Sequence, residues 1–165
     1  QRDKLLKKED ETAVSEEETS SNYVITISRE FGSGGREIGK LLAERVGFAK
    51  ESALIHELSQ KGSCIIVGRL ANYILKDMPT AYHVFISADL DAEAARVSAR
   101  DNISPQSAAA KVKKVNHERA IHCRHFTKTD WGNVKNYDLC IKSDDFGVAE
   151  TAQIIGDLFQ KKMGL

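Results

Sequence analysis

The sequence predicts a three-layer α/β domain in which helices flank a mostly parallel sheet. Short apolar runs that suit strands alternate with longer segments whose apolar residues recur every three or four positions, as on one face of a helix. The run Cys64–Val67 is continuously apolar, which is typical of a strand buried on both faces of a parallel sheet. A glycine-rich turn joins the first predicted strand, residues 23–28, to a predicted helix.

Strands and helices alternate along the rest of the chain. The strands are predicted at residues 23–28, 64–67, 82–87 and 137–142. The helices are predicted at residues 38–46, 53–61, 90–100, from Ser104–Pro105 onward, and 148–161. The last helix presents Ile154, Ile155, Leu158 and Phe159, a face that suits either the core or a dimer surface.

Size and composition indicate one folded domain preceded by an arm. The chain has 165 residues, of which 41% are apolar, enough for a single core in residues 23–165. Residues 1–22 are mostly charged or polar, so we expect a solvated or disordered arm. The net charge of zero argues against general affinity for nucleic acids or membranes. No signal peptide, membrane span or C-x-x-C pair is evident, so we expect a cytoplasmic protein.

The glycine-rich turn is the part of the chain most suggestive of chemistry, and it reads SREFGSGGRE over residues 28–37. Glycines let successive backbone N–H groups point inward, and the start of the following helix adds its positive dipole end. Both effects favour a bound phosphate. A purely structural turn between strand and helix is the alternative.

The turn fits neither common phosphate-binding pattern in full. In the P-loop pattern G-x-x-x-x-G-K-[ST], Gly35 as the second glycine puts Glu30 at the first glycine, Arg36 at the lysine and Glu37 at the hydroxyl residue. In the dinucleotide pattern G-x-G-x-x-G, Glu37 stands at the third glycine. The local pattern alone leaves phosphate binding and a structural turn both open.

Three segments in the same order resemble the cytidylate kinase-like family of bacterial proteins. They are ITISREFGSGGREIG at residues 25–39, GSCIIVGR at residues 62–69 and WGNVKNYDLC at residues 131–140. The resemblance extends over about residues 23–160. It implies a P-loop nucleoside monophosphate kinase fold, ATP with Mg²⁺ as the donor, small-molecule nucleotide substrates such as CMP or dCMP, and a monomer or homodimer.

The sequence departs from the family pattern at two places. After Gly47–Phe48, family members usually continue with a short strand, a Tyr-Asp pair and a helical segment that helps to hold the acceptor. Here the chain passes directly to residues 49–52, so either this region is missing or the sequence skips residues. Asn116 stands where we expect an aspartate three residues before Arg119, and an amide cannot anchor that arginine by charge.

The resemblance implies roles for particular residues. The ATP phosphates are expected to bind to the loop. Arg69, which follows the second predicted strand, is expected to bind the acceptor. The cofactor-binding residues are expected to be Gly32, Ser33, Gly34, Gly35, Arg36 and Glu37, with Arg36 in place of the usual lysine. The metal ligand is not identified, because Ser33, Glu30 and Glu37 all remain candidates.

A basic segment lies between the third and fourth predicted strands. Residues 96–128 contain eight lysines and arginines and two acidic residues. This segment resembles the mobile lid of monophosphate kinases, which we place at about residues 101–129. The lid would bring Arg100, Arg119 and Arg124 to the transferring phosphoryl group, where catalysis depends on positioned cations. The alternative is a pair of solvated basic helices.

Other functions remain open beside ATP-dependent transfer to a nucleoside monophosphate. A P-loop kinase for another small molecule would use the same loop and lid. A regulatory module that binds a nucleotide without transfer is favoured if the acceptor region is absent. Nucleic-acid binding by the basic segment is the weakest of these, because the segment lacks interleaved aromatic residues.

Overall fold

The computed structural model describes residues 22–47, 49–51 and 55–165. The predicted arm over residues 1–22 therefore lies, apart from Asn22, outside the described residues. The same holds for Phe48 and residues 52–54, around the point where the sequence departs from the family pattern.

A five-stranded sheet with the strand order β2-β3-β1-β4-β5 forms the middle of the domain. The strands are β1 (Val24–Arg29), β2 (Ala49–Glu51), β3 (Cys64–Val67), β4 (Ala81–Ser87) and β5 (Leu139–Lys142). Every neighbouring pair is parallel. The mostly parallel sheet predicted from the sequence is confirmed. The β2 strand was not predicted, because three residues are too few to show an alternating pattern.

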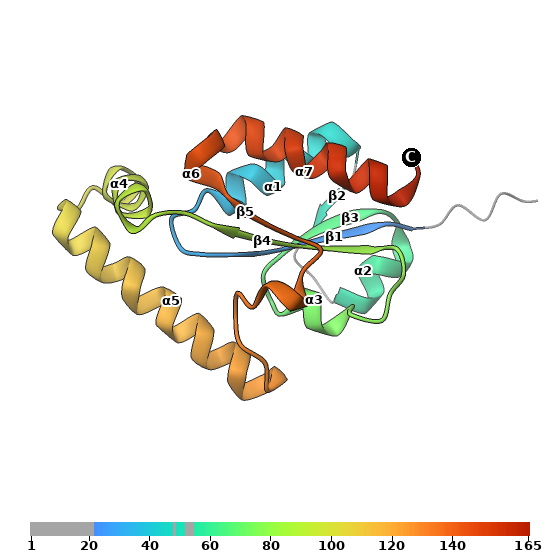
Figure 1. The fold of residues 1–165 in the computed structure, drawn as a ribbon, viewed down its shortest axis with the longest axis horizontal. Coiled ribbons are helices and arrows are strands. Elements are labelled where there is room, and N and C mark those ends of the chain that lie inside the picture. The colour runs from blue at the N-terminus through green and yellow to red at the C-terminus, as the bar shows by residue number, and fades with distance from the viewer. Residues whose placement is uncertain (1–21, 48, 52–54) are drawn as a thin grey trace, which may run out of the picture.

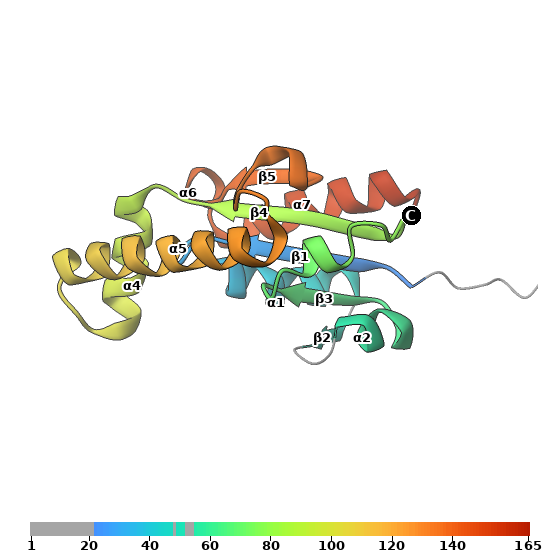
Figure 2. The same cartoon turned by 90° about the horizontal axis from the view of Figure 1, so that it is seen from below.

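Helices cover both faces of the sheet and give the three predicted layers (Figure 1). On one face lie α1 (Gly35–Val46) and α7 (Val148–Met163), and on the other lie α2 (Ile55–Lys61) and α3 (Ala71–Ile74). Two further helices, α4 (Leu90–Asp101) and α5 (Pro105–Thr127), lie beyond the carboxyl ends of the strands, and α5 runs back along the molecule (Figure 2). A 3-10 turn, η1 (Val134–Asn136), precedes β5, and α6 (Ser143–Phe146) follows it.

The central strand β1 divides the core between the two faces. Ile25 and Ile27 pack with residues of α1 and α7, whereas Val24 packs with Cys64 and with residues around α3. All three β1 side chains are fully buried. This burial explains why the sequence of β1 is mostly apolar. It also holds in place the strand that leads into the glycine-rich turn.

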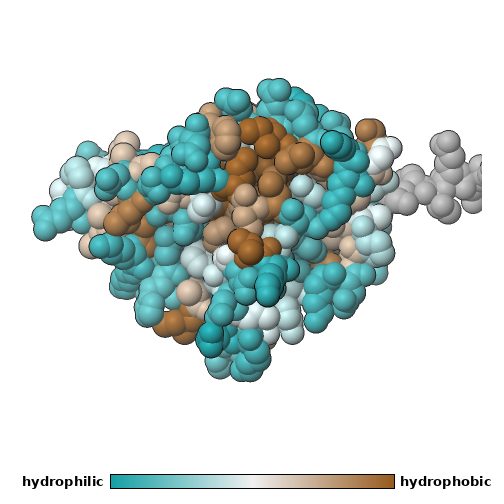
Figure 3. Space-filling model, viewed as in Figure 1, coloured by the Kyte–Doolittle hydropathy of each residue, from teal (hydrophilic) through white to brown (hydrophobic). Residues whose placement is uncertain are grey.

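The closing helix α7 belongs to the core. Ile155 and Phe159 are 0% and 1% exposed, whereas Leu158 is 40% exposed, so the predicted apolar face is split between core and surface. The ring of Phe159 meets Tyr23 and Tyr82 edge to face, with centroids 6.0 and 5.8 Å apart. Apolar surface gathers between α7 and the edge strand β5 (Figure 3).

We expect Phe159→Ala to destabilise the protein by about 3–5 kcal/mol, because it removes a buried ring and leaves a cavity between α7 and the sheet. Leu158→Ala on the same helix is the matched control and should cost far less, because that side chain is partly exposed. Urea unfolding of the three proteins measures both values. Equal losses for the two variants would show that α7 is not docked as described.

Candidate phosphate-binding site

A glycine-rich loop, residues 30–34, joins the carboxyl end of β1 to the amino end of α1. Gly32 and Gly34 have φ angles of 91° and 80°, a left-handed region that residues with a Cβ rarely adopt. Gly34 is the N-cap of α1, and no side chain caps the first N–H groups of this helix. These N–H groups, at the positive end of the helix dipole, suit an external anion.

Hydrogen bonds within the loop and from α6 fix the loop backbone. Ser33 is fully buried, and its Oγ donates to the carbonyl oxygen of Glu30 at 3.0 Å. The Oγ of Ser143 donates to the carbonyl oxygen of Ser33 at 2.5 Å. The Ser33 hydroxyl is therefore used to shape the loop and is not exposed to a ligand.

Helices α4 and α5 hold the opposite side of the loop. The Nη1 of Arg96 donates to the carbonyl oxygen of Gly32 at 3.1 Å. The Oδ1 of Asn116 accepts the N–H of Phe31 at 2.7 Å, and its Nδ2 lies 3.5 Å from Oε2 of Glu93. Asn116 therefore contacts both the loop and Glu93, with its amide oxygen as the acceptor for the loop N–H and its amide nitrogen as a donor toward the carboxyl group.

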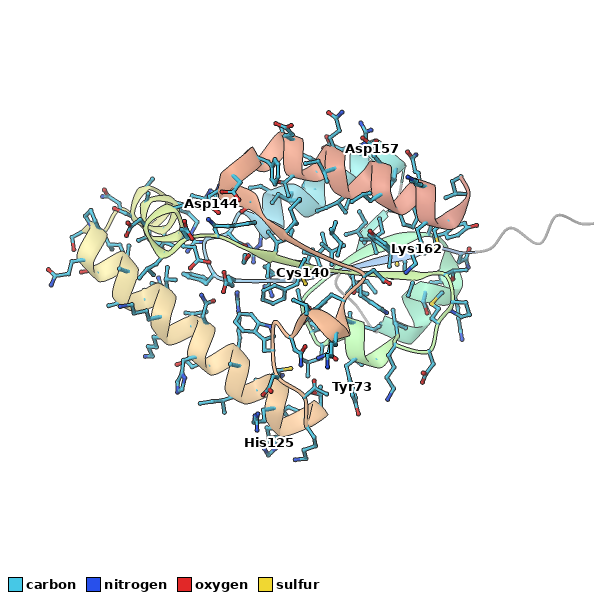
Figure 4. All side chains as sticks on the ribbon, viewed as in Figure 1. Tyr73, His125, Cys140, Asp144, Asp157 and Lys162 are labelled. Atoms are coloured by element: carbon cyan, nitrogen blue, oxygen red, sulfur yellow. The ribbon has the colours of Figure 1, made fainter. Side chains whose placement is uncertain are left out.

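A buried carboxyl group, Glu93, lies beneath the loop. It is 3% exposed, and a Cβ on Gly32 would lie 2.7 Å from the Glu93 carbonyl oxygen. Burial, together with the nearby carboxylates of Glu30 and Asp144, raises the pKa of Glu93 to about 8. Figure 4 shows Asp144 near the amino end of α6, on the side of the sheet where α4 lies. Glu93 is therefore mostly protonated at neutral pH and adds little negative charge to the site.

Three arginines from different elements gather above the loop. Arg29 ends β1, Arg36 lies in the first turn of α1, and Arg119 comes from α5. The Nη1 of Arg119 donates to the carbonyl oxygen of Arg29 at 2.9 Å. Burial, followed by the charges of Arg119 and Arg36, lowers the pKa of Arg29 to about 10, so it stays charged at neutral pH. None of the three forms an ion pair with a carboxylate in the part of the chain that the structure describes.

Two cavities share Arg29 and Arg119 in their linings, and Arg36 lines the larger of the two. The larger, of about 770 Å³, lies over the glycine-rich loop and extends to α4. The smaller, of about 410 Å³, lies between the turn after β3 and α5, and Trp131 is part of its wall. An anion at the shared wall would contact both cavities and two guanidinium groups.

The structure brings most of the predicted site residues into these cavities. Gly32, Gly34, Gly35, Arg36, Glu37, Arg100 and Arg119 line the larger cavity, and Arg69 and Arg119 line the smaller one. Ser33 lines neither, for the reason given above. The side chain of Arg100 lies over the Phe31 ring, 4.8 Å from its centroid, and also pairs with Asp101.

Arg124 is not brought to the site, contrary to the prediction. Its guanidinium is exposed and forms an ion pair with Asp130. Its neighbour His125 lies at the end of α5 away from the sheet (Figure 4). The helical spacing explains this result: at 3.6 residues per turn, Arg124 lies on a different face of α5 from Arg119, whereas His122, three residues after Arg119, still lines the smaller cavity.

Sequence reasoning did not assign four side chains of the candidate site: Arg29, Glu93, Arg96 and Asn116, the last of which binds the loop. A single charged residue in a helical pattern, such as Glu93 or Arg96, is normally interpreted as part of the solvated surface. Arg29 gave one usable signal, because it ends a buried strand at the edge where ligands bind in parallel sheets.

Together, the strand order, the loop after β1 and the helices beyond the strand ends define a P-loop kinase fold. A gluconokinase from Sinorhizobium meliloti has a TM-score of 0.56 at 14% identity, with 86% of this chain and 93% of that chain covered. An APS kinase from Mycobacterium tuberculosis, solved with AMPPNP and APS, has a TM-score of 0.52 at 19% identity, with 85% and 98% covered.

The chain belongs to the cytidylate kinase-like family, whose model matches residues 24–50 and 48–145. The two matched pieces meet at the place where the sequence departs from the family pattern. An uncharacterized protein from Eubacterium ventriosum is similar over 85% of this chain and 99% of its own, with 26% identity and a TM-score of 0.78. The comparison with curated proteins gave no match.

Two further structural findings concern the described ranges alone. None of their helices has the length and apolar character needed to span a bilayer. No group of three or more histidine, cysteine, aspartate or glutamate side chains in them is arranged to hold a metal ion.

The protonation of Glu93 predicts a specific pH dependence of stability. The unfolded carboxyl loses its proton above about pH 4.5, whereas the folded one keeps it to about pH 8, so unfolding releases a proton between these values. We therefore expect the free energy of unfolding to fall with rising pH in this window, relative to that of Glu93→Gln, and the difference to level off above pH 8. Denaturant unfolding at several pH values tests this, and parallel curves would contradict it.

Proposed function

We propose that the protein catalyses ATP-dependent phosphoryl transfer to a small acceptor. The observation that carries this proposal is the pair of cavities that share Arg29 and Arg119 at the edge of the glycine-rich loop. The larger cavity would take the phosphates of ATP, and the smaller one would take the acceptor. The transferring phosphoryl group would lie at the shared wall.

The arrangement suits this chemistry because phosphoryl transfer asks the protein mainly for position and positive charge. The N–H groups at the start of α1 would face the donor phosphates, and Arg36 and Arg100 line the same cavity. Arg119 would approach the transferring group from α5, which forms a wall of the smaller cavity. Guanidinium groups suit the role because their planar donors match phosphate oxygens.

Magnesium is expected to accompany ATP, since it is commonly bound through substrate phosphates and one or two carboxylates. The described residues do not fit a protein-held magnesium site, because their acidic side chains, including the neighbouring Glu30, Glu93 and Asp144, are not arranged to hold a metal ion. The Ser33 hydroxyl, for its part, donates to the carbonyl oxygen of Glu30. No ligand residue is therefore assigned to the ion.

We propose a nucleoside monophosphate, CMP or dCMP, as the acceptor. Family membership supports this choice, as does the presence of Arg29, Arg69, Arg119 and Trp131 around the smaller cavity, which suits an anionic group and an aromatic base. The second candidate is a different small acceptor, which is favoured by the break in the family match at residues 48–50. Residues 101–129 are proposed as the lid, since α5 borders the smaller cavity.

The proposed activity is tested by ATP consumption in the presence of Mg²⁺ and a panel of acceptors: CMP, dCMP, other nucleoside monophosphates, gluconate and shikimate. We expect ADP release that depends on CMP or dCMP, with the phosphorylated product identified by chromatography. Turnover of a sugar acid alone would support the second candidate. ATP binding without transfer to any acceptor would contradict a kinase and favour a regulatory module.

Arg119→Ala should lower kcat by about 100-fold or more, because it removes a cation from the wall shared by the two cavities. Lys114→Ala is the matched control, since Lys114 is exposed on the same helix and lines neither cavity. The melting temperature of each variant separates a loss of activity from a loss of folding. An unchanged kcat in folded Arg119→Ala would remove this residue from the proposed mechanism.

A further inference from the structure

The side chain of Arg29 occupies the space above the first residue of α1. A Cβ built on Gly35 would lie 2.7 Å from both Cβ and Cγ of Arg29, closer than real Cβ atoms approach their neighbours. No other residue type fits at position 35 while the stem of Arg29 lies there. Gly35 therefore accommodates a particular side chain rather than a backbone turn, because its own conformation is helical.

The other end of Arg29 reaches the turn after β3. A Cβ on Gly68 would lie 2.7 Å from Nη1 of Arg29. The side chain thus extends from the glycine-rich loop at Gly35 to the turn at Gly68 and lines both cavities along the way. Two glycines on different elements make room for one arginine.

This packing bears on how the P-loop pattern is aligned with the loop. The pattern G-x-x-x-x-G-K can also be placed one residue earlier, with Gly34 as its second glycine. In that placement Arg29 stands at the first glycine, and Gly35 stands at the lysine. Compared with the pattern, the glycine and the cation have exchanged places: Arg29 stands at a glycine position, and Gly35 stands at the lysine position. The structure shows these two residues packed against each other.

We propose that Arg29 supplies the phosphate-binding cation that the P-loop pattern otherwise places at position 35. This inference rests on the proposed function, because it assigns the cation for the nucleotide phosphates. The charge would come from the end of β1 instead of from the start of α1. Arg36 would then stand where the pattern has its hydroxyl residue, and its side chain would be a second cation of the larger cavity.

The surroundings of Arg29 support this role. It has no ion-pair partner among the described residues, and Arg119 bonds its carbonyl oxygen and adds a second positive charge nearby. A half-buried guanidinium beside other cations is unfavourable unless an anion joins them. Its backbone belongs to the central strand β1, and its side chain packs against Gly35 and Gly68, so few other positions are open to the charge.

The test is a reciprocal exchange of the two residues. Four full-length proteins are compared: the natural one, Arg29→Gly, Gly35→Lys and the double variant R29G/G35K, which has a complete G-x-x-x-x-G-K. The readouts are the Kd for a non-hydrolysable ATP analogue by calorimetry, the rate of phosphoryl transfer and the melting temperature. Lys40→Ala on α1 is the control, since Lys40 is exposed and lines neither cavity.

We expect Arg29→Gly to weaken analogue binding by about 10- to 100-fold, the usual effect of losing a charged hydrogen-bond donor. Gly35→Lys should also weaken binding, because its Cβ collides with the stem of Arg29. The double variant should bind more tightly than either single variant. A double variant that is folded and binds no better than the single ones would overturn the proposal.

Two further variants keep the test decisive if Arg29→Gly folds poorly. Arg29→Gln keeps most of the stem without the charge and should lose binding, whereas Arg29→Lys keeps the charge and should retain part of it. Full binding by folded Arg29→Gln would overturn the proposal and leave Arg36 as the lysine equivalent. If the natural protein itself binds no ATP analogue, the proposed function fails, and the assignment of Arg29 fails with it.

Discussion

The main constraint on the site is that the fold holds guanidinium groups close together although they repel one another. Arg29 and Arg119 approach each other although both are charged, and burial makes their charges more costly. Burial of apolar side chains around β1 and α7 contributes favourable free energy that can offset this cost. A bound polyanion would relieve this repulsion, so the same two charges that repel each other would favour a phosphate group placed between them.

The loop beneath these cations is held from several directions. Ser143 of α6, Arg96 of α4 and Asn116 of α5 each bond a backbone group of the loop, so its shape does not depend on its own sequence alone. The protonated carboxyl of Glu93 fits this scheme, because an ionised group there would weaken the field of the arginines. Preorganisation of this kind lowers the cost of binding an anion, since few groups must be reordered.

Sequence reasoning reached the layers of the fold and much of the site. The strands at 64–67 and 82–87 were predictable because burial on both faces leaves an apolar run, and the loop was predictable from Gly32 and Gly34, whose conformation needs glycine. The β2 strand was too short to carry a pattern. The roles of Arg29 and Glu93 depend on contacts between distant segments, which spacing along the chain does not reveal. Arg124 was expected at the site because charge alone does not tell which face of a long helix borders the cavities.

Helix α5 touches the loop at two points that lie three residues apart, one turn of the helix. Asn116 accepts the N–H of Phe31, and Arg119 donates to the carbonyl oxygen of Arg29, so the helix binds the two peptide groups on either side of Glu30, where β1 passes into the loop. The same helix forms a wall of the smaller cavity. A molecule in the smaller cavity that displaced α5 would therefore also strain these two hydrogen bonds. Thermodynamic linkage would then require an occupant of one cavity and an occupant of the other to change each other's affinity by the same factor.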